Sequence, residues 1–209
     1  MESDSYLTIK ASSQGLYKEK GSRFIGLVWP VTSTDEVRQI IESTRKEYHD
    51  ARHHCFAYML GRSRTTYRVS DDGEPSGAAG RPILAAINSA GLTDILIIVV
   101  RYFGGKLLGA GGLARAYRTA AEAAIGTSEV TELHEQAYYD IIFPYQAMNK
   151  VMSVLKENDV TQSAHRFENS CSMRINFRRS AEEKILSALS AIDGLKYAAT
   201  GAGEENNKA

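Results

Sequence analysis

The feature that most restricts the fold of this chain is a run of six aliphatic residues, Ile95–Val100, which a glycine-rich segment follows. A helix that spans a membrane needs about 18 or more consecutive apolar residues, so this run is too short to cross a bilayer. A short apolar run between turn residues is typical of a strand buried in a sheet. We therefore expect a buried strand over Asp94–Phe103, inside a globular domain.

The composition indicates an ordinary globular protein without a bulk affinity for polyanions. Hydrophobic residues make up 43% of the 209 residues and charged residues 24%, and the 25 basic side chains balance the 25 acidic ones. A protein of zero net charge does not coat nucleic acid or anionic membranes, so any anion site must be local. The start, Met1–Asp4, lacks the features of a signal peptide, and two distant cysteines favour a reducing compartment. We expect a cytoplasmic protein that does not bind membranes.

The N-terminal half alternates strand and helix patterns. The period-2 segments predict strands, with a turn at Gln14-Gly15, over Tyr6–Lys10, Phe24–Pro30, His53–Leu60 and Thr65–Ser70. The period-3.6 segments predict a helix over Thr34–Tyr48 with Thr34 as its N-cap, a short helix ending near Gly91, and an alanine-rich helix over Gly112–Ile125.

The C-terminal part has the order β-α-β-β-α-β, which is typical of a ferredoxin-like unit. Its expected elements are strands over Tyr138–Phe143, Val160–Phe167, Cys171–Phe177 and Leu195–Thr200, and helices over Tyr145–Asn158 and Ala181–Ile192. The polar segment 127–136 offers few core candidates, so we place the domain boundary there. The expected organisation is a domain over 1–130, a ferredoxin-like domain over 135–201 and a disordered tail over 202–209. Phe167 and Phe177 fit core positions better than an RNA-binding sheet surface.

The first candidate site is a polar loop that carries three carboxylates within four residues. Its pocket-forming residues are expected to be Asp71, Asp72, Glu74, Pro75, Ser76, Gly77 and Gly80. Ser76 is a plausible N-cap of the following helix, whose N-terminus would then favour an anion. The alternative is ordinary turn chemistry, since Asp-Gly and Pro-Ser-Gly are common turn sequences.

Catalysis by this loop stays open, with His53, Glu74 and Ser76 as the candidate residues. The glycines around Ser76 do not match the G-x-S-x-G nucleophile elbow, although a histidine could still reach the hydroxyl in space. Carboxylates of this kind suit magnesium or calcium, but the spacing of an EF-hand is missing. We expect no metal and no cofactor, and we favour a binding protein over an enzyme.

The second candidate site is the glycine-rich segment that connects the buried strand to the alanine-rich helix. Basic side chains occur four times between Ile95 and Ala121 and acidic ones not at all, which makes a local positive field. The expected anion-binding or nucleic-acid-binding residues are Arg101, Gly104, Gly105, Lys106, Gly109, Gly111, Gly112 and Arg115. Neither the Walker pattern nor a complete Rossmann fingerprint is present. Tight packing of strand against helix is the alternative explanation of the glycines.

The third segment, Ala51–Tyr58, contains two histidines and a cysteine. Because neighbouring residues of a strand face opposite sides, we expect His53 and Cys55 on one face and His54 on the other. A zinc site would need further ligands, and none is close in sequence. We expect one of these side chains to line the site and the other to pack in the core.

Four segments within the first 125 residues resemble the IMPACT/YigZ family: Lys20–Phe24, Ala51–Tyr58, Ser70–Pro82 and Arg101–Tyr117. The block Asp71–Gly77 is the most specific of the shared sequences. The chain departs from the family pattern at Ala78, where threonine is frequent, and at Leu107-Leu108, where Lys-Leu is common. The second departure removes one positive charge from the glycine-rich segment.

The resemblance implies an α+β protein in two parts. It implies an N-terminal domain with the fold shared by the second domain of a ribosomal small-subunit protein and domain IV of elongation factor G, and a C-terminal ferredoxin-like domain. Eukaryotic relatives regulate translation by competing for an activator of the amino-acid-starvation kinase. The bacterial two-domain relatives, which this chain resembles most, have no settled activity, and the chain shows no added N-terminal interaction domain, so we do not expect kinase regulation.

The leading hypothesis is a translation-associated regulatory protein that binds RNA, the ribosome or a phosphate-bearing ligand through the glycine-rich segment, Arg101, Lys106 and Arg115. It requires that the two loops fold together into one pocket that attracts negative charge. The alternatives are a small hydrolase or transferase acting on a phosphorylated or peptide substrate, and a protein-interaction module. The sequence does not determine the oligomeric state.

Overall fold

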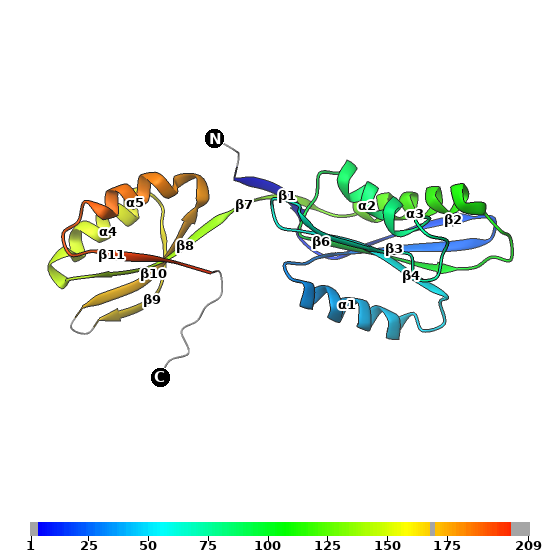
Figure 1. Cartoon of the computed structure of the whole chain (residues 1–209), viewed down its shortest axis with the longest axis horizontal. Helices are drawn as coiled ribbons and strands as arrows, with labels where there is room; N and C mark the ends of the chain where they lie inside the picture. Colours follow the sequence, from blue (N-terminus) through cyan, green and yellow to red (C-terminus); the bar gives the residue numbers. More distant parts are fainter. Residues whose placement is uncertain (1–3, 168–169, 202–209) are drawn as a thin grey trace. The chain divides into compact units, whose positions relative to one another are not determined.

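The computed structural model describes residues 4–167 and 170–201, which form five α-helices and three β-sheets of the α+β class. The chain divides into two compact units (Figure 1). The larger unit spans residues 6–133, and the smaller unit contains residues 134–201 together with residues 4 and 5. The N-terminal residues therefore depart from the expected boundaries of 1–130 and 135–201. The expected tail over 202–209 lies outside the described residues.

A five-stranded antiparallel sheet forms the centre of the larger unit. Its strands lie in the order β2 (Ser13–Glu19), β3 (Ser22–Pro30), β6 (Ile95–Tyr102), β4 (His53–Leu60) and β5 (Thr66–Ser70). Figure 1 shows α1 (Thr34–Glu47) on one face of this sheet and α2 (Gly80–Ser89) and α3 (Gly109–Gly126) on the other. The unit is thus built of three layers.

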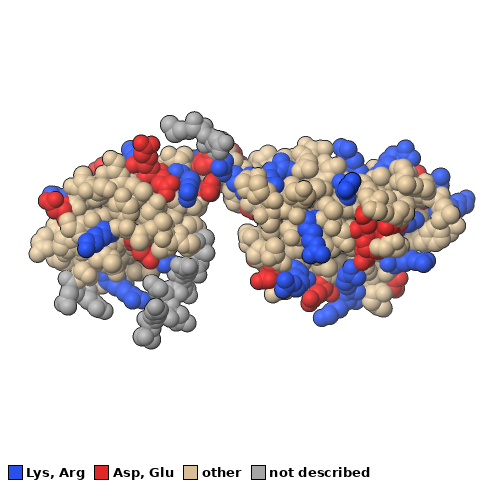
Figure 2. Space-filling model, viewed as in Figure 1, with Lys and Arg blue, Asp and Glu red and all other residues tan. Residues whose placement is uncertain are grey.

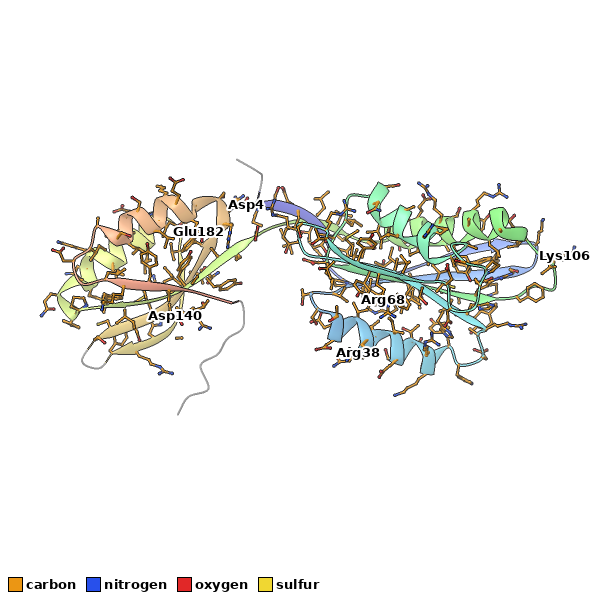
Figure 3. All side chains as sticks on the ribbon, viewed as in Figure 1. Asp4, Arg38, Arg68, Lys106, Asp140 and Glu182 are labelled. Atoms are coloured by element: carbon orange, nitrogen blue, oxygen red, sulfur yellow. The ribbon has the colours of Figure 1, made fainter. Side chains whose placement is uncertain are left out.

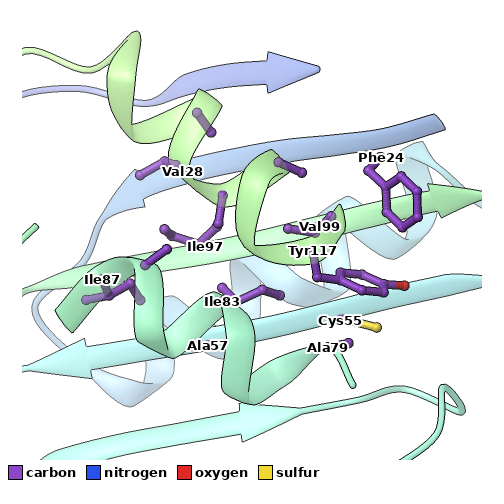
Figure 4. Packing of buried hydrophobic residues seen from close by; sticks show 14 of the residues in the cluster. Phe24, Val28, Cys55, Ala57, Ala79, Ile83, Ile87, Ile97, Val99 and Tyr117 are labelled. Carbon is purple, nitrogen blue, oxygen red and sulfur yellow. The ribbon is translucent and has the colours of Figure 1, made fainter. Parts of the chain in front are cut away.

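Strand β6 is buried on both faces, as its aliphatic run predicts. Ile95, Ile97 and Val99 belong to the core that α2 and α3 cover, and the alternate residues Leu96, Ile98 and Val100 belong to the core beneath α1. Figure 4 shows part of the first core, where helix side chains lie over the sheet. All six side chains are fully buried. Each contributes roughly 1.5–3 kcal/mol by leaving water, so this strand anchors both layers.

The N-cap of helix α1 lies one residue earlier than expected. The N-cap is Ser33, whose extended backbone allows its hydroxyl to accept the N–H of Glu36 at 3.2 Å. The Glu36 carboxylate in turn accepts the backbone N–H of Thr32 at 2.7 Å. The prediction of Thr34 as the cap was therefore wrong, because Thr34 is already inside the first turn.

Two glycines inside strands allow α3 to approach the sheet closely. From the sequence, one of them, Gly15, was expected to lie in a turn. The turn expected at Gln14-Gly15 is absent, since both residues lie within β2. A Cβ atom on Gly15 would lie 2.4 Å from the backbone nitrogen of Ala124, and one on Gly26 would lie 2.3 Å from the carbonyl oxygen of Ala120. The two positions must be glycine because helix backbone packs directly on strand backbone.

The polar segment in which we placed the domain boundary contains a strand. β7 (Val130–His134) pairs with β1 (Ser5–Ile9) in a separate two-stranded sheet. The N–H of Lys10 also donates to the carbonyl oxygen of Glu129 at 2.9 Å. Local composition missed this strand, because its partner lies more than a hundred residues away in the chain.

The smaller unit has the expected order of elements. These are β8 (Gln136–Phe143), η1 (Tyr145–Ala147), α4 (Met148–Glu157), β9 (Thr161–Phe167), β10 (Cys171–Arg178), η2 (Arg179–Ala181), α5 (Glu182–Ser190) and β11 (Lys196–Thr200). The strand order is β11-β8-β10-β9, and α4 and α5 lie on one face (Figure 1). Phe177 is buried against Tyr139, as expected, whereas Phe167 is 60% exposed at the end of β9, so its assignment to the core was wrong.

Asp4 ties the start of the chain into the smaller unit. Its carboxylate accepts the Nη2 of Arg178 at 3.0 Å and the backbone N–H of Ser180 at 3.1 Å, while its carbonyl oxygen accepts the N–H of Glu135 at 2.8 Å. The hydrogen bonds from Arg178 and Ser180 hold the pKa of Asp4 far below its ordinary value. These bonds explain why residues 4 and 5 belong to this unit.

Replacing Gly26 by alanine should destabilise the larger unit by about 1–3 kcal/mol or more, because the added methyl group collides with the backbone of α3. The measurement is urea unfolding followed by the fluorescence of Trp29, which is the single tryptophan and lies in β3. The matched control is Gly126→Ala at the end of α3, where a Cβ atom meets nothing within 4 Å and stability should be unchanged or slightly higher. Equal midpoints for Gly26→Ala and the wild type would contradict the close approach.

Candidate functional site

A buried polar cluster forms where β4 and β6 meet the loop between β5 and α2. We call it the Glu74 cluster, and it consists of His53, Cys55, Glu74, Arg101 and Tyr117. Glu74 Oε1 accepts from Arg101 Nη1 at 2.5 Å and from the Tyr117 hydroxyl at 2.8 Å, and His53 Nε2 lies 3.9 Å away. Only 4% of the Glu74 side chain and 7% of the Arg101 side chain are exposed. The two segments singled out in the sequence are therefore joined by a buried ion pair.

Aromatic rings enclose the guanidinium of Arg101. Its Cζ atom lies 5.4 Å from the ring centroid of Phe24 and 5.5 Å from that of Phe103, distances at which a cation is attracted to the ring. Phe24 also meets Tyr117 edge to face, with 5.2 Å between the centroids. Arg101 Nε is buried without a hydrogen-bond partner. Arg101 thus acts as a core residue whose charge is compensated by Glu74.

The thiol and the phenol of the cluster stay protonated. Burial raises the pKa of Cys55 to about 12, and burial followed by the proximity of Cys55 and Glu74 raises the pKa of Tyr117 above its ordinary value. The Cys55 thiol donates to the carbonyl oxygen of Asp71 at 3.0 Å. A buried, protonated thiol is a poor nucleophile, so Cys55 serves the loop as a hydrogen-bond donor.

Asp71 caps helix α2 from outside the helix. Its carboxylate accepts the backbone N–H groups of Gly77 at 2.8 Å, Ala79 at 3.0 Å and Gly80 at 2.8 Å. Ser76 is exposed, and the cap position is Ala79, so the prediction of Ser76 as the N-cap was wrong. The positive end of α2 is already satisfied by a carboxylate of the chain itself, which removes it as an anion site.

The histidines face opposite sides of β4, as the alternation of a strand predicts. His53 Nδ1 donates to the carbonyl oxygen of Asp72 at 2.8 Å on one side, and His54 Nε2 donates to the carbonyl oxygen of Tyr48 at 3.1 Å on the other. The Asp72 carboxylate accepts the backbone N–H of His54 at 2.7 Å and Arg45 Nη2 at 2.5 Å. These bonds fix the loop to both β4 and α1.

The three carboxylates of the loop have separate partners. Asp71 binds backbone N–H groups, Asp72 binds Arg45 and the N–H of His54, and Glu74 binds Arg101 and Tyr117. Within residues 4–167 and 170–201, no group of three or more His, Cys, Asp or Glu side chains is arranged to hold a metal ion. The density of carboxylates in the sequence therefore reflects three different structural bonds.

The glycines between β6 and α3 serve two different purposes. Gly104 is needed for packing, since its N–H donates to the Ser22 hydroxyl at 3.1 Å and a Cβ atom would lie 1.9 Å from the carbonyl carbon of Gly21. A Cβ atom on Gly105, Gly109 or Gly111 would meet nothing within 4 Å. Gly105 and Gly109 have φ angles of +83° and +70°, in the left-handed region that favours glycine, so the backbone of the turn accounts for them. Of the three, Gly111 alone is required neither by packing nor by a left-handed backbone.

Helix α3 begins three residues earlier than expected, inside the glycine-rich segment. Sequence propensity places the start at Gly112, because glycine disfavours helix, whereas the helix in the structure begins at Gly109. Its N-cap is Leu108, without a side-chain hydrogen bond, and its first turn contains no acidic residue. The first N–H groups of the helix thus lack a side-chain cap.

Two basic side chains flank this helix start. Lys106 and Arg115 are both exposed, and neither makes an ion pair within the part of the chain that the structure describes. Figure 3 labels Lys106 in the loop at the end of the larger unit. The exposed residues Gly109, Ala110 and Gly111 lie between them in the sequence. The features expected of an anion site thus occur together at the N-terminus of α3.

The structure separates the sequence candidates into four groups. His53, Glu74 and Arg101 meet in the buried cluster, while Asp71, Asp72, Gly77 and Gly80 form the cap of α2 and its connections. Pro75 and Ser76 are exposed on the loop, and Lys106 and Arg115 are exposed at α3. Sequence reasoning missed Phe24, Arg45 and Tyr117. The one available signal was Tyr117, the only aromatic residue in an alanine-rich helix.

Comparison with known proteins identifies the class to which this fold and site belong. Residues 20–125 match the family described as the Impact N-terminal domain, which contains both β4–β6 and the N-terminus of α3. The IMPACT family member YvyE of Bacillus subtilis strain 168 is 33% identical over 187 residues, covering 89% of this chain and 84% of that protein.

A second relative is the IMPACT family member YigZ of Escherichia coli K12. It is 45% identical over 100 residues, which cover 47% of this chain and 49% of that protein. A crystal structure of a hypothetical protein has 28% sequence identity and a TM-score of 0.73, and the match covers 95% of this chain and 98% of the other. The chain belongs to the IMPACT family.

Removing the carboxylate of Glu74 should destabilise the larger unit strongly. Glu74→Ala leaves the Arg101 guanidinium buried without a counter-ion, which costs about 3–5 kcal/mol. Tyr117→Phe removes only one hydrogen bond to the same oxygen and should cost about 0.5–1.5 kcal/mol. Urea unfolding monitored by Trp29 fluorescence gives both values, and a Glu74→Ala cost no larger than that of Tyr117→Phe would contradict the ion pair's role.

The stability contributed by Asp71 should depend on acid pH. Burial raises the pKa of Asp71, but the hydrogen bonds from Gly77, Gly80 and Ala79 outweigh it, so the folded-state pKa lies below the ordinary 3.8. The contribution is present above pH 3.8 and is lost as pH falls through the folded-state pKa. The urea midpoint of Asp71→Asn should lie below that of the wild type at pH 7, and the gap should narrow below pH 3.8. A gap independent of pH would exclude this cap.

Proposed function

We propose that this protein is a translation-associated regulatory protein that binds RNA, ribosomal RNA included, or a phosphate-bearing ligand at the N-terminus of α3. The observation that carries the proposal is a helix start with no side-chain cap and no acidic residue in its first turn. Lys106 and Arg115, exposed on either side of it, supply positive charge. Backbone N–H groups, the helix dipole and flanking cations together favour phosphate oxygens.

In this proposal the Glu74 cluster does not contact the ligand; it fixes the elements that surround the site. Arg101 is the penultimate residue of β6, just before the loop that leads to α3, and Tyr117 projects from the third turn of α3 onto the same carboxylate. The ion pair therefore connects the strand, the acidic loop and the helix. Arg101, an expected ligand contact, becomes in this proposal a residue that positions the loop.

The charge distribution of the larger unit supports a polyanion ligand. Glu74 is neutralised by Arg101, and Asp71 and Asp72 are enclosed by hydrogen bonds. Figure 2 shows Lys and Arg side chains spread along the visible face of this unit, with an acidic patch among them. A local field of this kind strengthens phosphate binding even though the whole chain has no net charge.

The architecture also supports a role near the translation machinery. We propose that the smaller unit is a ferredoxin-like domain, because it has the element order β8-α4-β9-β10-α5-β11 and the sheet order β11-β8-β10-β9. For the larger unit we retain the proposed likeness to the second domain of a ribosomal small-subunit protein. The proposed likeness of the larger unit to part of a ribosomal protein supports a role near the ribosome.

No specific observation favours the hydrolase or transferase alternative. Glu74 accepts from Arg101 and Tyr117, so it does not present a free carboxylate, and Ser76 is exposed on the outer part of the loop. His53 keeps one ring nitrogen on the Asp72 carbonyl. RNA binding is therefore the proposal that we develop.

Binding of RNA to the full chain should weaken as salt rises, because phosphate contacts release counterions. The double variant Lys106→Ala, Arg115→Ala should bind a labelled single-stranded RNA at least about tenfold more weakly at low salt. It should also reduce the slope of log affinity against log salt by about two. Fluorescence anisotropy measures both quantities.

The matched control is Arg38→Ala, an exposed arginine on α1 that pairs with Asp35, together with wild-type circular dichroism for every variant. Arg101 is left unchanged, because its removal would unfold the core that holds the loop. Equal affinity and equal salt slope for the double variant and the wild type would overturn the proposal.

A further inference from the structure

A groove lies on the α1 face of the larger unit, beside the edge strand β2. Its volume is about 290 Å³, and the residues that line it are Gln14, Gly15, Leu16, Arg23, Ile25 and Tyr48. None of these residues belongs to the Glu74 cluster or to the N-terminus of α3. The groove is therefore a separate feature of the unit.

The groove exists because α1 does not extend over the outer strand of the sheet. Leu16 pairs with Ile25, and Gln14 pairs with Leu27 in the antiparallel register of β2 and β3. Leu27 is only 7% exposed beneath α1, whereas Leu16 is 52% exposed. Tyr48, at the C-cap of α1, closes one side of the uncovered area.

The chemistry of the lining fits a nucleobase. Leu16 and Ile25 offer a flat apolar floor, and Tyr48 offers an aromatic wall. The Gln14 amide has both donors and acceptors, which suit the edge of a base, and Arg23 adds a guanidinium. The Arg23 Cζ atom lies 5.3 Å from the ring centroid of Tyr102, so this guanidinium is held in place.

The charges at the rim indicate the direction in which a phosphate would leave the groove. Lys18 pairs directly with Arg23 across the hairpin, so both side chains lie on the groove's face near the turn. Burial, followed by the charge of its neighbour Glu47, raises the pKa of the Tyr48 phenol. Lys18 and Arg23 thus place positive charge at the hairpin end of the groove, and the last turn of α1 carries Arg45 and Lys46 beside Glu47.

The hairpin turn connects the groove to the proposed phosphate site. Gly21 of the turn is in direct backbone contact with Gly104, and Ser22 accepts the Gly104 N–H. The groove and α3 lie on opposite faces of the sheet, and the turn lies at the end of the sheet where the loop with Lys106 begins. A single strand that enters the groove can therefore follow Lys18 and Arg23 around this end.

We propose that the groove binds one base of a single-stranded RNA whose backbone continues to Lys106 and Arg115. This inference rests on the proposed function and adds a base-stacking site to it. It predicts that the protein distinguishes a strand with bases from a bare sugar-phosphate chain, because apolar and aromatic side chains bind the face of a base.

The test compares two labelled probes on the full chain by fluorescence anisotropy. One is a uridine oligonucleotide of about 12 nucleotides, and the other is an abasic chain of the same length, both within the site sizes typical of single-strand binding. The wild type should bind the uridine oligonucleotide roughly 5-fold or more tightly than the abasic chain. Leu16→Ser and Gln14→Ala, both at exposed positions, should remove most of this preference and leave the abasic affinity unchanged.

The matched control is Tyr67→Ser, an exposed aromatic residue on the other edge strand, β5, which should keep the wild-type preference. A wild type that binds both probes equally, with dependence on Lys106 and Arg115, overturns the groove proposal and leaves the proposed function standing. A wild type that binds neither probe overturns both. A preference that survives in both Leu16→Ser and Gln14→Ala overturns the groove as the base site.

Discussion

The buried ion pair between Glu74 and Arg101 is the interaction on which the rest of the larger unit depends. It joins the acidic loop to the end of the central strand β6, and Tyr117 attaches α3 to the same carboxylate oxygen. A charge in the core is tolerated only when its counter-charge is equally fixed, so each partner determines the position of the other. Phe24 and Phe103 exclude water around the guanidinium.

This arrangement decides which polar groups remain for a ligand. The carboxylates of the acidic loop are bound by groups of the chain itself: Asp71 caps α2, and Asp72 accepts hydrogen bonds from β4 and α1. Exposed positive groups near these loops include Lys106 and Arg115 around the start of α3, and Lys18 and Arg23 at the β2–β3 hairpin. Both sets lie at the end of the sheet that the ion pair stabilises. The buried Glu74–Arg101 ion pair thus stabilises the end of the sheet where these exposed basic side chains lie, although it is not itself exposed.

Sequence patterns predicted the elements well where burial is periodic. The six-residue aliphatic run gave β6, and the alternation in β4 correctly separated His53 from His54. They failed where a distant partner decides the outcome. Gly15 lies in a strand because α3 packs on it, and β7 forms because β1 pairs with it. Ser76 has the chemistry of an N-cap, but Asp71 reaches the same N–H groups from further back in the chain.

The sequence by itself determined that the chain is an α+β protein of the IMPACT family, and it singled out the loops around Asp71 and after Arg101 as candidate sites. These conclusions depend on residue identity and spacing, which are local properties. Only the tertiary structure decided that Arg101 faces Glu74 inside the core and that Lys106 and Arg115 remain outside it. A charged side chain is paired within the protein or left exposed to a ligand according to which group the fold places within hydrogen-bonding distance of it. That distance is set by the packing of β6, α3 and the acidic loop.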